Sequence, residues 1–202
     1  IDNTDILAVI NGEKMSAKLV ELPALELSKN YRVRVSDGSV GSGQSQRVSW
    51  AEGKFLIYSD ATSDIYLFDH IRDSLRLITF PHQLVPNARS GDFPNEVESY
   101  EKFREVTNEI SKLVTFSQLF FDKSRQIYLR FAQMNWGFDQ ETETVSGEIY
   151  LFSYDKEFNL TGEVEIEELE SIPFQSFMKD GKLYSRWVVG ENPAFIVHSF
   201  DF

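Results

Sequence analysis

The chain has 202 residues, with 20 basic and 32 acidic side chains, a net charge of −12 at pH 7, three histidines and no cysteine. Its length allows one sizeable hydrophobic core or two small ones. The lack of cysteine excludes disulfides, thiolate zinc sites and a thiol nucleophile. Because the acidic surface would repel a phosphate backbone, nucleic acid is not an expected partner.

The sequence contains no membrane-spanning pattern. No stretch approaches the roughly 18 uninterrupted apolar residues that cross a bilayer, so we expect no transmembrane segment in this chain. Residues 1–5 have neither the basic nor the apolar part of a signal peptide. Since residue 1 is isoleucine and not methionine, we interpret the chain as a portion of a longer protein.

The first 46 residues predict a hairpin, a third strand and a loop. The apolar runs 6–10 and 14–22 flank Asn11-Gly12, and Asn-Gly favours the positive backbone angles of a tight hairpin turn. Residues 31–35 alternate apolar and basic side chains, which predicts another strand. The segment 36–46 is rich in glycine and serine and is typical of a surface loop.

Three series of short strands follow, each joined by turn residues in the manner of an antiparallel meander. The first is expected at 47–50, 55–58, 65–68 and 75–79, the second at 116–121, 127–131, 148–152 and 163–166, and the third at 174–178, 182–188 and 195–200.

The three series look like copies of one unit. A polar turn precedes an aromatic-rich strand in each, at 52–54, 122–125 and 180–182, and the segments 64–68 and 148–152 are nearly identical. Repeats of about 40–50 residues with four strands are typical of propeller blades. We therefore predict an all-β fold of antiparallel four-stranded blades, a β-propeller or a C-terminal portion of one. A generic meander or sandwich is the alternative.

An insertion at 81–113 interrupts the repeats. After an irregular part, an amphipathic helix is expected near 95–113, because apolar residues recur on one face at helical spacing. A packed crossover is the favoured role, and a lid is the alternative.

The domain prediction is a single propeller-like domain over residues 1–202. Its expected blades are 1–35 (partial), 46–80, 114–167 and 173–202. The last blade lacks an outermost strand, which residues 14–22 or 31–35, or a missing portion, would supply. Open edge strands would promote dimerisation.

Four segments, 147–155, 158–163, 121–131 and 177–184, carry a resemblance to a known family. Their turns and strands are similar to a Bacteroides-type family of β-propeller-like lipoproteins, the domain of unknown function 4221, over roughly residues 48–202. The resemblance implies a propeller and export to the periplasm or cell surface, with lipid anchoring upstream of this chain. It implies no activity and no catalytic or binding residue.

The search for catalytic and metal-binding patterns gives no candidate. His70, His82 and His198 are isolated, without the spacing of metal ligands. The glutamates of 163–170 fit a solvated strand edge, with a cation-binding stripe as the alternative. The glycine-rich segment 38–43 lacks the Gly-Lys-Ser/Thr ending of a phosphate loop. We therefore expect no catalytic residue, no metal ligand and no cofactor.

One aromatic residue has promise as a ligand contact. Trp136 is predicted in a long polar connection, 133–146, beside Asn135. An exposed indole together with Arg130 would stack on a sugar or a peptide and donate hydrogen bonds to it. The alternative is that Trp136 folds back onto its own blade.

His82 and Arg104, in or near the insertion, form a second candidate ligand site. The preferred function is a non-enzymatic ligand-binding or scaffolding module of an exported bacterial protein, with a glycan, a peptide or a protein as ligand. The alternative is a carbohydrate-active enzyme that uses carboxylates near the propeller axis.

Overall fold

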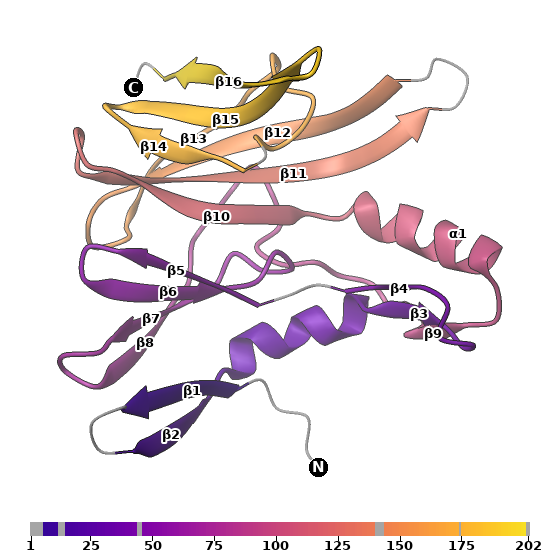
Figure 1. Ribbon diagram of the computed structural model, residues 1–202, viewed down its shortest axis with the longest axis horizontal. Coiled ribbons are helices and arrows are strands. Elements are labelled where there is room, and N and C mark those ends of the chain that lie inside the picture. The colour runs from indigo at the N-terminus through magenta and orange to yellow at the C-terminus, as the bar shows by residue number, and fades with distance from the viewer. Residues whose placement is uncertain (1–5, 12–14, 44–45, 140–143, 174, 201–202) are drawn as a thin grey trace. The chain divides into compact units, whose positions relative to one another are not determined.

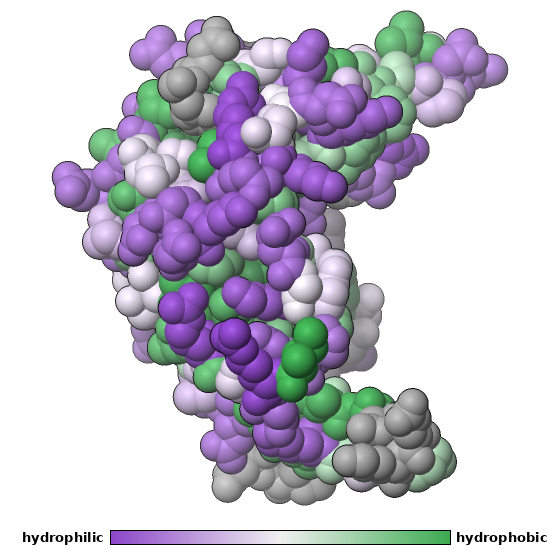
Figure 2. Space-filling model, turned by 90° about the vertical axis from the view of Figure 1, so that its left-hand side faces the viewer, coloured by the Kyte–Doolittle hydropathy of each residue, from purple (hydrophilic) through white to green (hydrophobic). Residues whose placement is uncertain are grey.

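The computed structural model describes residues 6–11, 15–43, 46–139, 144–173 and 175–200. These residues are mostly β-strands in antiparallel sheets of up to four strands, and they form no closed barrel (Figure 1). Contacts divide the chain into unit 1 (Ile1–Thr79 and Ser90–Thr107) and unit 2 (Phe80–Arg89 and Asn108–Phe202). Hydrophilic side chains cover much of the face seen in Figure 2, with small apolar areas between them.

Unit 1 begins with the predicted hairpin. β1 (Ile6–Asn11) pairs antiparallel with β2 (Ser16–Glu21), whereas the turn at 12–14 lies outside the described residues. The 3₁₀ helix η1 (Pro23–Tyr31), which the sequence did not predict, follows β2 and has proline in its first turn. Leu22 and Leu25 are buried at its start. Their burial stabilises η1, although its sequence shows no clear helical spacing of apolar residues.

The four-stranded sheet of unit 1 matches the predicted meander. Its strands are β5 (Arg47–Ala51), β6 (Lys54–Tyr58), β7 (Ile65–Asp69) and β8 (Ser74–Ile78), in that order.

One face of this sheet packs against η1. Ile57, Tyr66 and Phe68 form a buried cluster with Leu22 and Leu25. The Tyr66 hydroxyl accepts a hydrogen bond from the backbone N–H of Ala24 at 3.1 Å. The start of η1 is therefore fixed by both apolar and polar contacts with the sheet.

A small mixed sheet replaces part of the predicted loop and part of the predicted helix. It consists of β3 (Val33–Val35), β4 (Gly41–Ser42) and β9 (Glu96–Val97). β3 pairs in parallel with β9, which departs from the antiparallel expectation. The Arg34 guanidinium meets the Glu96 carboxylate at 2.7 Å, and Asn95 donates to the carbonyls of Lys29 and Arg32. These contacts hold residues 95–97 in extended form.

The inserted helix is therefore shorter than predicted. α1 (Tyr100–Ser111) begins after Ser99, whose hydroxyl accepts from the backbone N–H of Lys102 at 3.2 Å. Val106 and Ile110 are buried on its apolar face, as the helical spacing indicated.

The first sheet of unit 2 contains β10 (Thr115–Asp122), β11 (Ile127–Asp139), β12 (Thr144–Tyr154) and β13 (Leu160–Glu165), again in chain order.

The expected connection 133–146 is wrong, because β11 and β12 continue through most of it as a long hairpin. The register shifts between Met134 and Gly137, where Asn135 has φ of 52°. This bulge interrupts the alternation that would have shown a longer strand. Residues 140–143 lie outside the described residues.

The second sheet of unit 2 has three described strands, β14 (Phe177–Lys179), β15 (Lys182–Val189) and β16 (Asn192–Ser199). These match the predicted third series, although residue 174 lies outside the described residues. The sheet lies against β10–β13 (Figure 1), and the two sheets share one core. Buried in that core are Phe120, Leu129, Phe131, Ile149, Leu151 and Leu183.

Arg125 joins the turns of these two sheets. It pairs with the buried Asp122 carboxylate at 2.7 Å, and it donates to the carbonyls of Gly181 and Phe200, each at 2.8 Å. Gly181 has φ of +73°, and a Cβ there would stand 2.9 Å from the hydroxyl of Ser124. The turn therefore needs glycine both for its backbone and for this close approach.

We expect Arg125→Ala to lower the free energy of unfolding by about 2–3 kcal/mol, because the buried Asp122 charge loses a charged hydrogen-bond partner. Lys123→Ala, in the same turn but exposed, should change it by less than about 0.5 kcal/mol. Urea unfolding followed by circular dichroism measures both, and equal effects of the two variants would contradict the role of Arg125.

Candidate functional site

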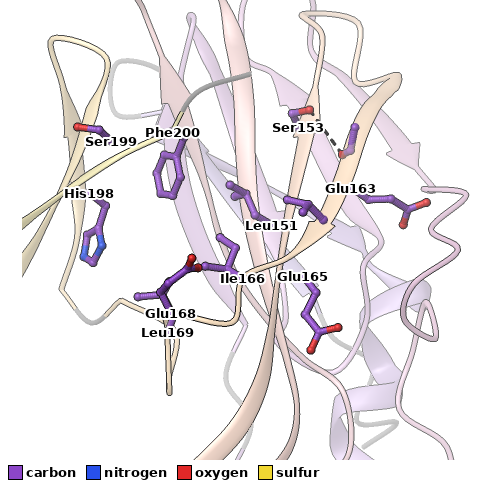
Figure 3. Close-up of a pocket in the computed structure, with 12 residues that line it drawn as sticks. Leu151, Ser153, Glu163, Glu165, Ile166, Glu168, Leu169, His198, Ser199 and Phe200 are labelled. Atoms are coloured by element: carbon purple, nitrogen blue, oxygen red, sulfur yellow. Dashed lines mark hydrogen bonds between the residues drawn. The ribbon is translucent and has the colours of Figure 1, made fainter.

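A hollow opens in unit 2 between the outer strands of the two sheets, β13 and β16 (Figure 3). Its volume is about 760 Å³, within the range typical of ligand pockets. It is lined by Leu151, Ser153, Gly162, Glu163, Val164, Glu165, Ile166, Glu168, Leu169, His198, Ser199 and Phe200.

Different strand numbers in the two sheets leave this space open. β13 is the fourth strand beside β12, whereas β16 is the outermost described strand of the sheet β14–β16. Leu151 pairs with Val164 in the register, so both side chains point from one face of β12–β13. In Figure 3 the side chains of Leu151, Ile166 and Phe200 gather at the middle of the hollow. The floor is therefore apolar.

The carboxylates differ in where they lie around this floor. Glu163 and Glu165 alternate with Val164 along β13, and Figure 3 shows their side chains pointing away from the hollow. Glu163 accepts hydrogen bonds from the backbone N–H groups of Gln83 and Leu84. Glu168 lies beyond the end of β13 and is exposed at the rim, which gives the hollow a negative charge at one end.

His198 contributes a neutral polar group at the β16 side. Its Nε2 lies 3.0 Å from the hydroxyl of Ser185, and burial lowers the pKa of the imidazole. In the part of the chain that the structure describes, no group of three acidic or histidine side chains could hold a metal ion. The hollow therefore offers apolar contact and hydrogen bonds.

Several aspartates elsewhere have shifted pKa values, all in the direction of stronger acids. Each accepts hydrogen bonds from residues shortly after it in the chain, from side chains as well as from backbone N–H groups, and these bonds favour the charged form. For Asp122 burial opposes the shift, but hydrogen bonds from Ser124 and Arg125 still keep its pKa low. The others are Asp37, Asp69 and Asp155. Carboxylates of this kind stabilise turns, whereas a general acid needs a raised pKa.

His82 and Arg130, which the sequence assigned to two candidate sites, lie together in the interior of unit 2. Arg130 is fully buried, with its guanidinium 4.9 Å from the centre of the Phe116 ring and its Nε donating to the carbonyl of Ser117. The Nε2 of His82 lies 2.7 Å from the hydroxyl of Tyr154. Arg130 therefore does not present its guanidinium at the surface.

The environment of His82 favours its neutral form. Burial is the main cause and the positive charge of Arg130 adds to it, so the pKa falls to about 4, against opposing effects of Glu163 and Asn87. The imidazole stacks on Phe80 and contacts Phe152. It therefore acts as a polar aromatic residue of the core.

Asn135 and Trp136 lie at the bulge of β11, so the loop placement of Trp136 was wrong. The indole Cδ1 is 3.4 Å from the place that a Cβ on Gly147 would take, so the ring lies over the backbone of the neighbouring strand. Asn135 is exposed and donates to the Glu148 carboxylate at 2.7 Å, which also accepts from the hydroxyl of Tyr150. The alternative that Trp136 folds back onto its sheet is therefore favoured.

Arg104 is exposed on α1 within unit 1, whereas the other four predicted residues belong to unit 2. The structure thus brings together His82 with Arg130, and Asn135 with Trp136. Ligand binding by any of the five stays a prediction.

The sequence reasoning missed the apolar floor of the hollow. It treated Val164 and Ile166 only as residues between glutamates, and His198 as an isolated histidine. The signal that was present is the contrast between two series with four strands and a third with three. That contrast indicates a missing strand position in the third sheet. The position becomes a hollow only because β13 and β16 face each other in the folded structure.

These features define the chain as a mostly-β module of antiparallel sheets with a hollow between two of them. The family model for a domain of unknown function, DUF4221, matches residues 1–165, and the chain belongs to this family. The match begins further upstream than the expected 48–202 and ends at residue 165, so the segment 177–184, which also carried the resemblance, lies outside it.

A crystal structure of a DUF4221 member from Bacteroides vulgatus ATCC 8482 has a similar fold, with a TM-score of 0.58 and 14% sequence identity over 96% of this chain. The chain spans 55% of that protein's length in the structure. Comparison with curated proteins gives no match. In the described part of the chain, no helix combines the length and the apolar composition needed to cross a membrane.

We expect the stability of the protein to rise between about pH 4 and pH 6.5 through His82. The unfolded histidine binds a proton below its ordinary pKa of 6.5, whereas the folded one stays neutral down to about 4. Protonation therefore favours the unfolded state in this window, by up to about 3 kcal/mol.

Thermal unfolding of the native protein and of His82→Phe from pH 4 to 8 measures this contribution. At pH 8 the difference between the two gives the packing cost of the substitution alone. The difference should shrink towards pH 4, and parallel curves would show that His82 has no part in the pH dependence.

Proposed function

We propose that the chain is a non-enzymatic binding and scaffolding module and that the hollow between β13 and β16 binds its ligand. The observation that carries the proposal is an open apolar floor with one acidic residue, Glu168, at its rim. Binding of a ligand to such a surface is favourable because it removes apolar side chains from water. Of the three glutamates around the hollow, Glu163 and Glu165 point away from its floor.

We further propose that the sheets are blades of a β-propeller. In support, the sheets β10–β13 and β14–β16 pack face to face through one apolar core, as neighbouring blades do. The opposite face of β14–β16 carries Phe177, Phe195 and Val197, all exposed. Phe177 stacks on Tyr184 and meets Phe195 edge to face. An apolar aromatic face of this kind suits the packing of a further sheet.

The cellular setting follows from the family resemblance alone. We propose export to the periplasm or the cell surface, with a lipid anchor upstream of this chain. The related DUF4221 structure comes from Bacteroides vulgatus, which fits a bacterial setting for the family.

The alternative of a carbohydrate-active enzyme requires a carboxylic acid with a raised pKa beside a second carboxylate. The described aspartates with resolved shifts all have lowered pKa values. We give binding precedence over catalysis because the floor of the hollow is apolar.

Glycan and peptide arrays test the binding function with the native protein and Val164→Arg, which places a charge on the floor of the hollow. Val189→Arg is the matched control, because Val189 is exposed at the end of β15 outside the hollow. We expect Val164→Arg to weaken array binding at least about tenfold and Val189→Arg to retain it. Binding that neither substitution alters would contradict the site, and hydrolysis of chromogenic glycosides would contradict the non-enzymatic function.

A further inference from the structure

We propose that a groove in unit 1, lined among others by Lys29, Arg32 and Arg34, binds a small phosphate monoester, and that Arg32 holds its phosphate group. This basic groove has a volume of about 500 Å³ and lies where the end of η1 meets the sheet β4-β3-β9. It belongs wholly to unit 1 and shares no residue with the hollow in unit 2. The inference therefore goes beyond the proposed function.

Cationic side chains dominate the charge of the basic groove. Lys29, Arg32 and Arg34 contribute three positive charges, whereas Glu96 is the one carboxylate among the residues that line it. The whole chain carries a charge of −12, so this local excess of positive charge stands against the average of the molecule. A concave site with charge of one sign attracts small ions of the opposite sign.

The backbone places Arg32 and Arg34 on the same face. Arg32 has extended backbone angles, with φ of −91° and ψ of 121°, and β3 continues directly from it. Successive side chains of an extended chain alternate between two faces. Val33 and Val35 are buried on one face, whereas the two arginines are exposed on the other. Burial of the valines thus fixes the side on which the guanidinium groups emerge.

The two arginines differ in what compensates their charge. The Nε and Nη2 of Arg34 donate to one oxygen of Glu96, at 2.9 and 2.7 Å, so this pair is close to neutral. Lys29 meets Glu26 at 4.0 Å. Among the described residues, no acceptor forms a hydrogen bond or an ion pair with the Arg32 guanidinium. Arg32 is therefore the cation on which the proposal depends.

Two glycines keep the groove open beside the arginines. A Cβ on Gly41 would stand 3.6 Å from the Cβ of Arg34, and one on Gly43 would stand 3.9 Å from the Cγ of Arg32. Neither glycine is among those with positive φ, so the backbone itself does not require glycine at either position. The glycine-rich segment 38–43, which lacks the ending of a phosphate loop, thus leaves space next to two guanidinium groups.

Asn95 fixes the main chain that carries the cations. Its side-chain amide donates to the carbonyl of Lys29 at 2.9 Å and to that of Arg32 at 2.7 Å. These carbonyl oxygens are therefore already engaged by a donor. Because the backbone at Arg32 is held in place, a ligand need only order the side chain, which lowers the entropic cost of binding.

A phosphate monoester matches this arrangement. Its charge at pH 7 is about −1.5 to −2, which two cationic side chains balance. The planar fork of Arg32 fits two phosphate oxygens, and Lys29 adds a point charge. The hydroxyl of Ser42 and the carboxylate of Glu96 also line the groove, and both suit the hydroxyl groups of a sugar-sized body.

Nuclear magnetic resonance titration of the whole chain with glucose 6-phosphate at low salt tests the site. We expect the backbone amide signals of residues 41–43 to shift, with a Kd of about 1 mM or tighter. Glucose has the same body without the phosphate, and we expect it to bind at least about tenfold more weakly.

Substitutions at the arginine locate the phosphate. Arg32→Gln should weaken binding of glucose 6-phosphate about tenfold or more, because a charged donor is lost. Arg76→Gln removes the same charge from an exposed position on β8 and should leave the Kd unchanged.

A second pair of variants adds charge instead. Gly43→Asp places a carboxylate beside Arg32, which should compensate the guanidinium and weaken binding about tenfold. Gly137→Asp adds the same charge in unit 2, where a Cβ meets open space, and should leave the Kd unchanged. Circular dichroism checks that each variant keeps the native fold.

Four results would overturn the inference. The first is no binding of glucose 6-phosphate, and the second is equally tight binding of glucose. The third is native affinity in both Arg32→Gln and Gly43→Asp. The fourth is an equal loss of binding in the controls Arg76→Gln and Gly137→Asp, which would show an effect of net charge and not a site at Arg32.

Discussion

The apolar contact between the two sheets of unit 2 is the interaction on which its structure depends. Phe131 and Leu151 from one sheet and Leu183 from the other are almost completely removed from water. Burial of each such side chain is worth roughly 1.5–3 kcal/mol. The core also fixes the facing of the two sheets, and Arg125 fixes the turns at their ends through three oxygen acceptors. The hollow takes its position from this contact.

The number of strands in each sheet decides which part of the apolar surface stays uncovered. Where both sheets have a strand, side chains fill the space between them and water is excluded. Beyond β16, the floor formed around Val164 lacks that cover in the described part of the chain. A surface of this sort is suited to binding because the free energy of covering it is still available. The glutamates of β13 do not change this, since Glu163 and Glu165 point away from the floor.

The polar residues that suggested ligand binding show how tertiary context can reassign a side chain. Arg130 has the chemistry of a surface contact, yet it is buried over the face of Phe116. A guanidinium tolerates this place because the ring and the carbonyl of Ser117 replace part of its hydration. Trp136 likewise lies over the backbone at Gly147. Neither arrangement can be inferred from the spacing of residues in the sequence, because the contacting residues lie on other strands.

The sequence by itself determined the strand-rich class, the order of the main sheets and several of their boundaries. Alternation and turn residues are local signals, so β5 to β8 and β14 to β16 were predictable from them. It could not determine where β11 ends, because the bulge at Asn135 interrupts the alternation. It also could not show that β9 pairs with β3, because parallel pairing joins residues that are far apart in the sequence. The tertiary structure alone decided that Arg130 is buried and that β13 and β16 enclose a hollow. Both depend on how the sheets pack against each other, which the local sequence pattern does not encode.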